Sequence, residues 1–285
     1  MKGFFWTWLW AVPVLLLFSY VTTAVVNGGE RALELRGLDG EMCLPAILFL
    51  EIGPDYEPEA VKAQAVIARS NFYRRLQEGE TLGNILRETG EKIRGKTIFS
   101  VLKSLEKREG LYEEAVGETA GWVLAYEGKL RLVPYHEISG GRTRNGEEVF
   151  RSQEYAYLTS VESLEDKRAG DLLSSRYKPA EQLPKQLKIR EKDSSGYVTV
   201  LEANGYLLEG ETFAQGMGLA SSNFTIQRLE DKVRFLCRGR GHGLGFSQHG
   251  GNEMAKAGKT WKEILTAYFP KMELVGLEQI ERRAG

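Results

Sequence analysis

Residues 48–70, LFLEIGPDYEPEAVKAQAVIARS, contain the start of a helix and, just before it, a carboxylate in an unusual setting. Pro58 suits the first helical turn, where its missing N–H group costs nothing. Glu57 and Glu59 flank it and favour the positive end of the helix dipole. Glu51 has no such explanation, because it follows directly on the apolar run that ends at Leu50.

The helix predicted over residues 58–77 is apolar nearly all round, which indicates that it is mostly buried. Lys62, Gln64 and Arg69 are its polar exceptions. Lys62 and Arg69 are seven residues apart and therefore share a face. This face is either a solvent-exposed edge or a polar stripe that lines a cleft and binds Glu51 or a ligand.

Helical patterns dominate the first half of the chain. Residues 44–51 (LPAILFLE) are expected to form a buried, strand-like element, and residues 80–117 further helix with glycine breaks. A short amphipathic helix is predicted near the end, over residues 260–269.

Hairpin patterns begin near Gly121. Turn pairs at Glu127-Gly128 and Asn204-Gly205 predict two hairpins, and residues 224–237 predict a third. The polar segment 162–195 is a candidate boundary or excursion. Helices first and hairpins later indicate an α+β fold, in which the hairpins surround a substrate cleft.

The N-terminal segment carries no charged residue from Gly3 to Gly29. Its apolar run, residues 4–26, is long enough to cross a bilayer, which needs roughly 20 apolar residues. Lys2 precedes it and favours a cytoplasmic N-terminus. We therefore predict a membrane anchor in residues 1–29, in contact with the membrane through residues 3–26, with a cleaved signal peptide as the alternative. Residues 30–285 would form a single exported domain at the cell membrane.

Composition excludes some classes of function. The formal net charge is −1, with Lys and Arg spread along the chain, so we expect no nucleic-acid partner. The two cysteines, Cys43 and Cys237, could pair in an exported protein, but half-buried core positions explain them better. Neither has the neighbours of a structural zinc site, and we expect no metal and no cofactor.

The segment CRGRGHGLGFSQHGG, residues 237–251, is dense in glycine. It is not a P-loop, because no Gly-Lys-Ser/Thr follows. Leu244 breaks the dinucleotide pattern GxGxxG, and His249 breaks the nucleophile elbow GxSxG around Ser247. What remains is a tight backbone path that presents His242, Ser247 and Gln248 at close range. The alternative is a glycine-packed crossing with His242 as a satisfied core histidine.

A second polar loop lies in YHEISGGRTRNGEEVF, residues 135–150. A strand ends at His136, and small hydrogen-bonding groups follow at Ser139, Gly140, Gly141 and Thr143. This loop is either a surface turn or one of two loops that line a common cleft.

Together these segments resemble the stage II sporulation protein D and amidase-enhancer family of bacterial cell-wall proteins. The resemblance lies in residues 50–70, 135–150, 216–226 and 238–258, followed by TWKEILTAYF, and covers roughly residues 35–275. It implies a protein that remodels peptidoglycan, and its sporulation members are lytic transglycosylases. They cleave glycan strands between N-acetylmuramic acid and N-acetylglucosamine and leave a 1,6-anhydro end.

The resemblance places the family's catalytic glutamate at Glu51. A carboxyl group after four apolar residues is expected to be partly desolvated, and desolvation raises the pKa of a carboxylic acid. A protonated Glu51 could give its proton to the leaving oxygen. Because the 6-hydroxyl of the muramic acid itself attacks, one carboxylate can act as acid and then as base. The glycan would be positioned by a set of polar residues and glycines: Lys62, Gln64, Arg69, His136, Ser139, Gly140, Gly141, Thr143, His242, Ser247 and Gln248.

The sequence departs from the family pattern at three positions. Gly53 stands where proline is usual, His249 where an aromatic residue is common, and Ser139 where some members have a zinc-binding cysteine. The rival hypothesis is a non-catalytic glycan binder that stimulates a cell-wall amidase or assembles with other sporulation wall proteins.

Overall fold

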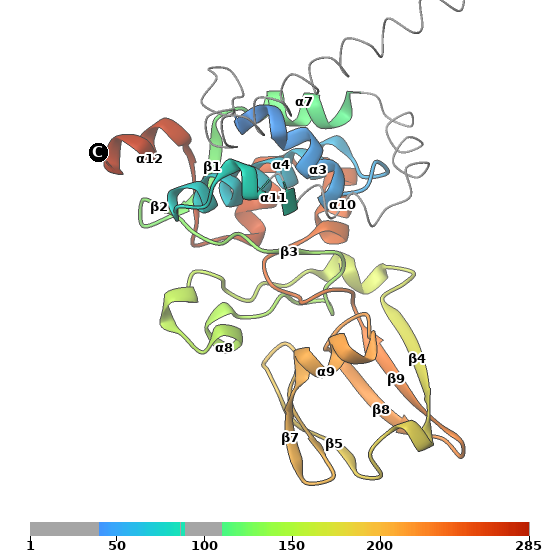
Figure 1. The fold of residues 1–285 in the computed structure, drawn as a ribbon. Helices are drawn as coiled ribbons and strands as arrows, with labels where there is room; N and C mark the ends of the chain where they lie inside the picture. The colour runs from blue at the N-terminus through green and yellow to red at the C-terminus, as the bar shows by residue number, and fades with distance from the viewer. Residues whose placement is uncertain (1–39, 86, 89–109, 285) are drawn as a thin grey trace, which may run out of the picture.

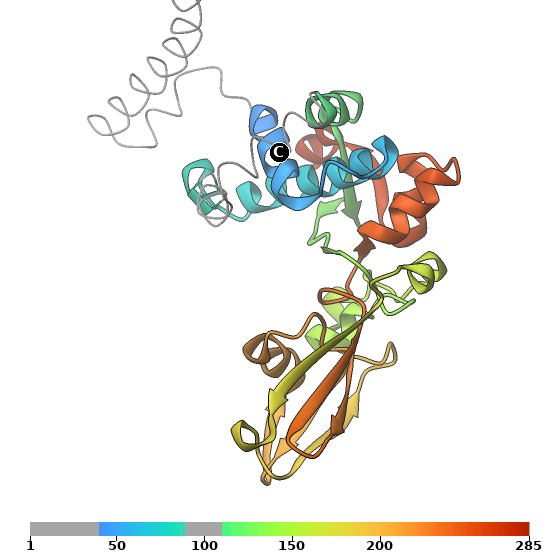
Figure 2. The same ribbon diagram turned by 90° about the vertical axis from the view of Figure 1, so that its right-hand side faces the viewer.

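The computed structural model describes residues 40–85, 87–88 and 110–284, which form two lobes (Figures 1 and 2). A helical lobe holds both ends of the described chain, and a β lobe holds much of the middle. The segments around β3 (Tyr135–His136) and β10 (Phe246–Ser247) lie where the lobes meet. The predicted α+β class is confirmed, with antiparallel pairing within each of the three-stranded sheets.

The central element of the helical lobe is α4 (Pro58–Gln77), and the predicted helix is confirmed at both ends. Val61 and Ala65 join one apolar cluster, whereas Val66 and Ile67 join another. The helix therefore lies between two cores, which explains why its sequence is apolar nearly all round. Further α-helices are α3 (Leu44–Glu51), α7 (Leu111–Glu118), α8 (Gly146–Phe150), α9 (Gly210–Met217), α10 (Gln248–Lys256), α11 (Trp261–Tyr268) and α12 (Leu277–Ala284).

The run LPAILFLE is a helix, so the strand-like expectation for it is wrong. In α3, Leu44 and Leu48 are buried at helical spacing, and Ile52 follows one turn later in the same apolar cluster. A short apolar run fits a buried strand and a buried helix equally well by periodicity. Here the run is covered by α4 and α7, so the helix is the form that buries it.

The helical lobe also contains a small antiparallel sheet. The predicted hairpin of β1 (Trp122–Tyr126) and β2 (Lys129–Leu130) is confirmed, and β11 (Glu273–Gly276) pairs with the other edge of β1. The predicted C-terminal helix is α11, which begins with a capping box of Thr260 and Glu263.

The β lobe consists of two three-stranded sheets around one apolar core. Both predicted hairpins are confirmed, and Asn204 takes the left-handed conformation that a tight turn requires. Two of its strands, β4 (Leu173–Pro179) and β5 (Leu187–Lys192), lie in the polar segment 162–195, where the sequence pattern did not indicate strands. The strands are β4 (Leu173–Pro179), β9 (Lys232–Arg238) and β8 (Phe224–Arg228) in one sheet, and β5 (Leu187–Lys192), β6 (Val198–Ala203) and β7 (Tyr206–Glu209) in the other.

The predicted anchor, residues 1–29, and most of the predicted helical region 89–109 lie outside the described residues. Residues 82–85 and 87–88 are helical, in agreement with the prediction for that region. Within residues 40–85, 87–88 and 110–284, the helices are too short or too polar to span a bilayer.

Candidate active site

Glu51 is the last residue of α3, and two glutamine side chains hold it in place. Gln64 of α4 donates its Nε2 hydrogen to the Glu51 carboxylate at 2.8 Å. Gln248, the first residue of α10, donates to the Glu51 backbone oxygen at 2.8 Å and to the Gln64 side-chain oxygen at 3.2 Å. Three predicted site residues from three separate segments therefore meet in one network. Glu51 is half-buried, whereas both glutamines are buried.

Tyr135 of β3 is a further neighbour of Glu51. Burial raises the pKa of its hydroxyl far above the usual range, and the negative charge of Glu51 and a hydrogen bond to it act in the same direction. The Tyr135 hydroxyl therefore stays protonated and donates to the Glu51 carboxylate. Sequence reasoning missed this residue, although it stands directly before His136 in the polar loop segment.

The glycine-rich segment takes the tight path that its sequence predicts. β10 runs parallel to β3, which brings the segments 135–150 and 237–251 side by side as expected. At Gly245, where φ is 67°, a Cβ atom would lie 2.1 Å from the Pro134 carbonyl oxygen. At Gly243, where φ is 78°, it would lie 2.3 Å from the Tyr197 hydroxyl. Both positions require glycine, so the crossing fixes where Ser247 and Gln248 emerge.

Asp166, in the 3-10 helix η3 (Leu164–Arg168), joins the two loops. One of its carboxylate oxygens accepts from the backbone N–H and the hydroxyl of Ser139, at 3.0 and 2.6 Å. The other accepts from the Ser247 hydroxyl at 3.0 Å and lies 3.2 Å from Nδ1 of His249. Ser139 and Ser247 thus hold the walls of the site. Sequence reasoning missed Asp166, because nothing in its polar segment distinguishes it from surface acids.

His136 and His242 lie together, with ring centroids 5.9 Å apart. Burial lowers the pKa of His136 to about 4, helped by the proximity of His242, and Nδ1 of His136 lies 3.0 Å from the Leu244 carbonyl oxygen. Burial also lowers the pKa of His242, whose Nδ1 accepts from the Leu244 backbone N–H at 3.1 Å. Both imidazoles are therefore neutral at pH 7 and act as packed hydrogen-bonding groups.

Lys62 and Arg69 share a face of α4, as predicted, but this face contacts the end of α7 rather than Glu51. Lys62 pairs with Glu59 and Glu118. Arg69 is fully buried and donates to Glu41 at 2.8 Å and to the backbone oxygens of Thr119 and Val116 at 2.7 and 2.9 Å. The interpretation that this stripe reaches Glu51 is wrong, because the helix turns these two side chains away from Gln64.

The remaining predicted site residues shape the polar loop. The Thr143 hydroxyl accepts from the backbone N–H of Val161 at 2.9 Å and is buried. A Cβ atom at Gly140 would lie 2.8 Å from the Asn223 side-chain nitrogen, and one at Gly141 would meet Lys167. The two glycines let these polar side chains approach the loop backbone closely.

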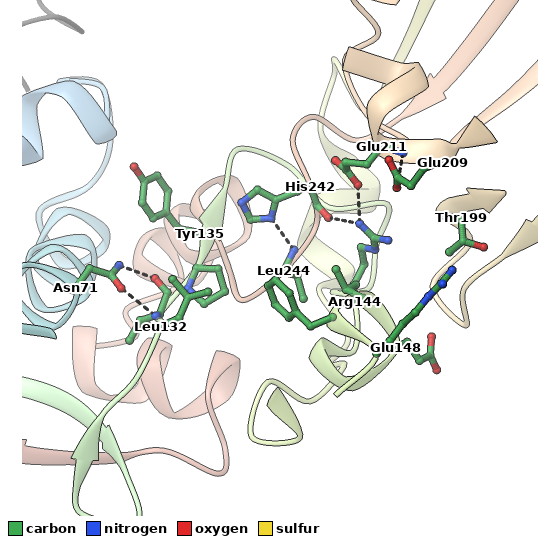
Figure 3. Close-up of a pocket in the computed structure, with 15 residues that line it drawn as sticks. Asn71, Leu132, Tyr135, Arg144, Glu148, Thr199, Glu209, Glu211, His242 and Leu244 are labelled. Carbon is green, nitrogen blue, oxygen red and sulfur yellow. Dashed lines mark hydrogen bonds and ion pairs between the residues drawn. The ribbon is translucent and has the colours of Figure 1, made fainter. Parts of the chain in front are cut away.

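A cavity of about 760 Å³ opens between the lobes (Figure 3). Asn71 and Tyr135 line it from the helical side, and Thr199, Glu209 and Glu211 line it from the β side. Glu51 is not among its lining residues, but Tyr135 touches both the cavity and the Glu51 carboxylate.

The described residues include no cluster of three or more histidine, cysteine, aspartate or glutamate side chains that could hold a metal. The structure does not pair Cys43 with Cys237 in a disulfide, and Cys237 packs in the core of the β lobe.

Comparisons with known proteins agree with the motifs. The model of a family described as "Stage II sporulation protein" matches residues 30–126. Stage II sporulation protein D of Bacillus subtilis (strain 168) is 30% identical over 245 residues, which cover 78% of this chain and 70% of that protein. The protein of the same name from Bacillus amyloliquefaciens is 29% identical and covers 80% and 72%. The amidase enhancer of Bacillus subtilis (strain 168) is 22% identical over 80% of this chain but 39% of its own length. The chain belongs to the stage II sporulation protein D family.

Proposed function

We propose that this protein is a peptidoglycan lytic transglycosylase that cleaves glycan strands between N-acetylmuramic acid and N-acetylglucosamine, with Glu51 as its acid–base residue. The observation that carries the proposal is the network of Glu51, Gln64 and Gln248, since residues distant in sequence fix one half-buried carboxyl group. Half-burial leaves the carboxyl accessible to a substrate, and the two amides and the Tyr135 hydroxyl limit its orientations.

The reaction needs one proton donor and one nucleophile, and the substrate supplies the second. Glu51 in its acid form gives a proton to the glycosidic oxygen of the leaving N-acetylglucosamine as the C1–O4 bond breaks. The 6-hydroxyl oxygen of the muramic acid then bonds to C1 and loses its proton to the protein. No water is consumed, and the product carries a 1,6-anhydro ring.

The predicted site residues divide by their contacts. Gln64 and Gln248 hold Glu51, while Ser139, Ser247 and Thr143 hold the loops through buried bonds. His242 and Tyr135 line the cavity between the lobes. Tyr135 also contacts the Glu51 carboxylate, so one residue links the cavity to the Glu51 network. The substrate is therefore expected to contact Glu51, Tyr135 and the cavity wall. The buried residues would hold Glu51 and the loops in position without contacting the substrate.

We place the protein at the cell membrane, with residues 3–26 as a single-pass anchor and the described domain on the extracytoplasmic side. Peptidoglycan lies on that side, so the location agrees with the substrate. The names of the Bacillus relatives favour a role in sporulation and a cell-wall amidase as a partner.

The test uses the full chain, purified in detergent, and glycan strands freed of stem peptides. Mass spectrometry should detect anhydro-disaccharides with the wild type and none with Glu51→Gln. Glu113→Gln, an exposed residue of α7, is the matched control and should retain activity. Full activity in Glu51→Gln would contradict the assignment. Glycan binding without product, together with stimulation of an added amidase, would favour the non-catalytic enhancer instead.

A further inference from the structure

The cavity between the lobes has an apolar wall that includes an exposed aromatic ring. Phe150, at the end of α8, lines the cavity and is 39% exposed. Its ring stacks on that of Tyr155, with the ring centroids 4.0 Å apart, so a neighbour already holds it in place. Leu132, Pro134 and Leu244 line the same space. Apolar walls of this kind bury the body of a ligand, and the few polar groups among them select it.

The carboxylates that line this cavity already have partners within the protein. Glu148 accepts from the backbone N–H and the hydroxyl of Ser194, at 3.0 and 2.9 Å. Glu209 caps α9 by accepting from two backbone N–H groups in its first turn. Glu211 pairs with Arg144 at 2.9 Å (Figure 3). These acids therefore stabilise the wall and do not call for a cationic ligand.

Two arginines line the cavity, and they differ in their partners. Arg144 is 4% exposed and pairs with Asp193 at 2.6 Å in addition to Glu211. Arg151 is exposed, and within the described part of the chain its side chain has no hydrogen bond or ion pair. Its guanidinium group is therefore available to an anionic ligand, and guanidinium can bind a carboxylate through two parallel N–H groups.

The backbone of Arg151 is also unusual. The residue ends α8 in the left-handed conformation, with φ 52° and ψ 39°. Glycine is the usual residue at such a helix end, because a side chain disfavours this conformation. Strained backbone of this kind is often found at ligand sites, and here it agrees with a role for the Arg151 side chain in the cavity.

We propose that the cavity between the lobes is a subsite for a muramic acid residue of the glycan strand, and that Arg151 binds the carboxylate of its lactyl group. The inference rests on the glycan substrate of the proposed function and deepens it. N-acetylglucosamine is neutral, whereas N-acetylmuramic acid without a stem peptide carries a free lactyl carboxylate. Phe150 packs against the sugar ring. Tyr135 lines the cavity and contacts the Glu51 carboxylate, so it joins this subsite to the acid–base residue.

The test measures equilibrium binding of two probes to the full chain in detergent. One probe is glycan strands freed of stem peptides, and the other is the same strands with their lactyl carboxylates converted to methyl amides. The wild type should bind the amidated strands about 10-fold more weakly, in the range of one charge-assisted contact. Arg151→Gln should bind the unmodified strands about 10-fold more weakly than the wild type does, with no further loss on amidation. Because Arg151 is exposed, this variant is expected to fold.

Arg176→Gln is the matched control, because Arg176 is an exposed arginine of β4 that is not among the lining residues of the cavity. It should keep the wild-type affinity and the wild-type preference for unmodified strands. An equal loss in this control would overturn the inference, since it would indicate a general attraction of the strand to positive charge.

Three other results would overturn the inference: no binding of the unmodified strands by the wild type, equal binding of both probes, or the same loss on both probes in Arg151→Gln. The measurement does not require cleavage. If the wild type releases no anhydro product but prefers the unmodified strands through Arg151, the catalytic role of Glu51 fails and the subsite stands.

Discussion

Glu51 and Asp166 are both carboxylates at the meeting of the same loops, yet their surroundings are opposite. Glu51 is half-buried. The Gln64 amide and the Tyr135 hydroxyl contact its carboxylate, and the Gln248 amide contacts its backbone oxygen. Asp166 is fully buried and contacts two serine residues and a histidine through both carboxylate oxygens. The Glu51 side chain is partly exposed, whereas that of Asp166 is fully buried.

In the proposed mechanism the reactive acid is the partly exposed carboxylate, which the Gln64 amide and the Tyr135 hydroxyl orient. The supports of Glu51 depend on where α10 begins, since Gln248 is its first residue and Ser247 its N-cap. Ser247 in turn is held by Asp166. Through Ser247, the buried Asp166 carboxylate therefore helps to fix the start of α10, from which Gln248 contacts Glu51.

Removal of the Asp166 carboxylate is the strongest test of the difference between the two carboxylates. Asp166→Ala leaves the Ser139 N–H and two hydroxyls without their acceptor in a buried place, and should lower the free energy of unfolding by about 3 kcal/mol. Chemical denaturation measures it. Glu51→Gln, by contrast, should change the stability by less than about 1 kcal/mol while abolishing activity. Equal stability losses in the two variants would remove the distinction.

His136 is buried in its neutral form, and it extends the comparison to the pH dependence of the protein's stability. The pKa of His136 is lowered by burial to about 4 in the folded protein, so the unfolded chain binds its proton first as the pH falls. Stability should therefore be full above the unfolded value, about 6.5, and decline towards pH 4 by up to roughly 3 kcal/mol. Denaturation at stepwise pH measures the decline. His136→Gln should flatten it, and an unchanged slope would assign the decline to other groups.

The smallest expected effect concerns the support of Glu51 itself. Gln64→Leu removes the hydrogen bond to the Glu51 carboxylate but keeps an apolar side chain of similar size in the buried position. We expect roughly a 5-fold loss of kcat with KM nearly unchanged, because one such hydrogen bond contributes about 1 kcal/mol. Steady-state kinetics on purified glycan strands gives both constants. A loss confined to KM would instead indicate that Gln64 binds substrate.

The sequence predicted the elements whose signals are local. The helix α4 with Pro58 in its first turn, the tight turn at Asn204-Gly205 and the glycine crossing all follow from residue chemistry within a few positions. Glu51, Gln64 and Gln248 were predicted as site residues, and the structure places them in one network.

The missed features depend on tertiary contacts. The run of α3 is a helix only because α4 and α7 cover it, and Arg69 turns away because Glu41 and the end of α7 satisfy its guanidinium. Asp166 and Tyr135 have no local pattern that marks them. Their roles arise from partners more than 25 residues away, such as Ser247 for Asp166.

The glycine crossing has a consequence for mutational tolerance. Gly243 and Gly245 combine left-handed backbone with a neighbour that a Cβ atom would overlap, at the Tyr197 hydroxyl and the Pro134 oxygen. Both positions should therefore reject every side chain, alanine included. In a saturation mutagenesis screen for activity, they would resemble catalytic residues although neither has a side chain to offer a substrate.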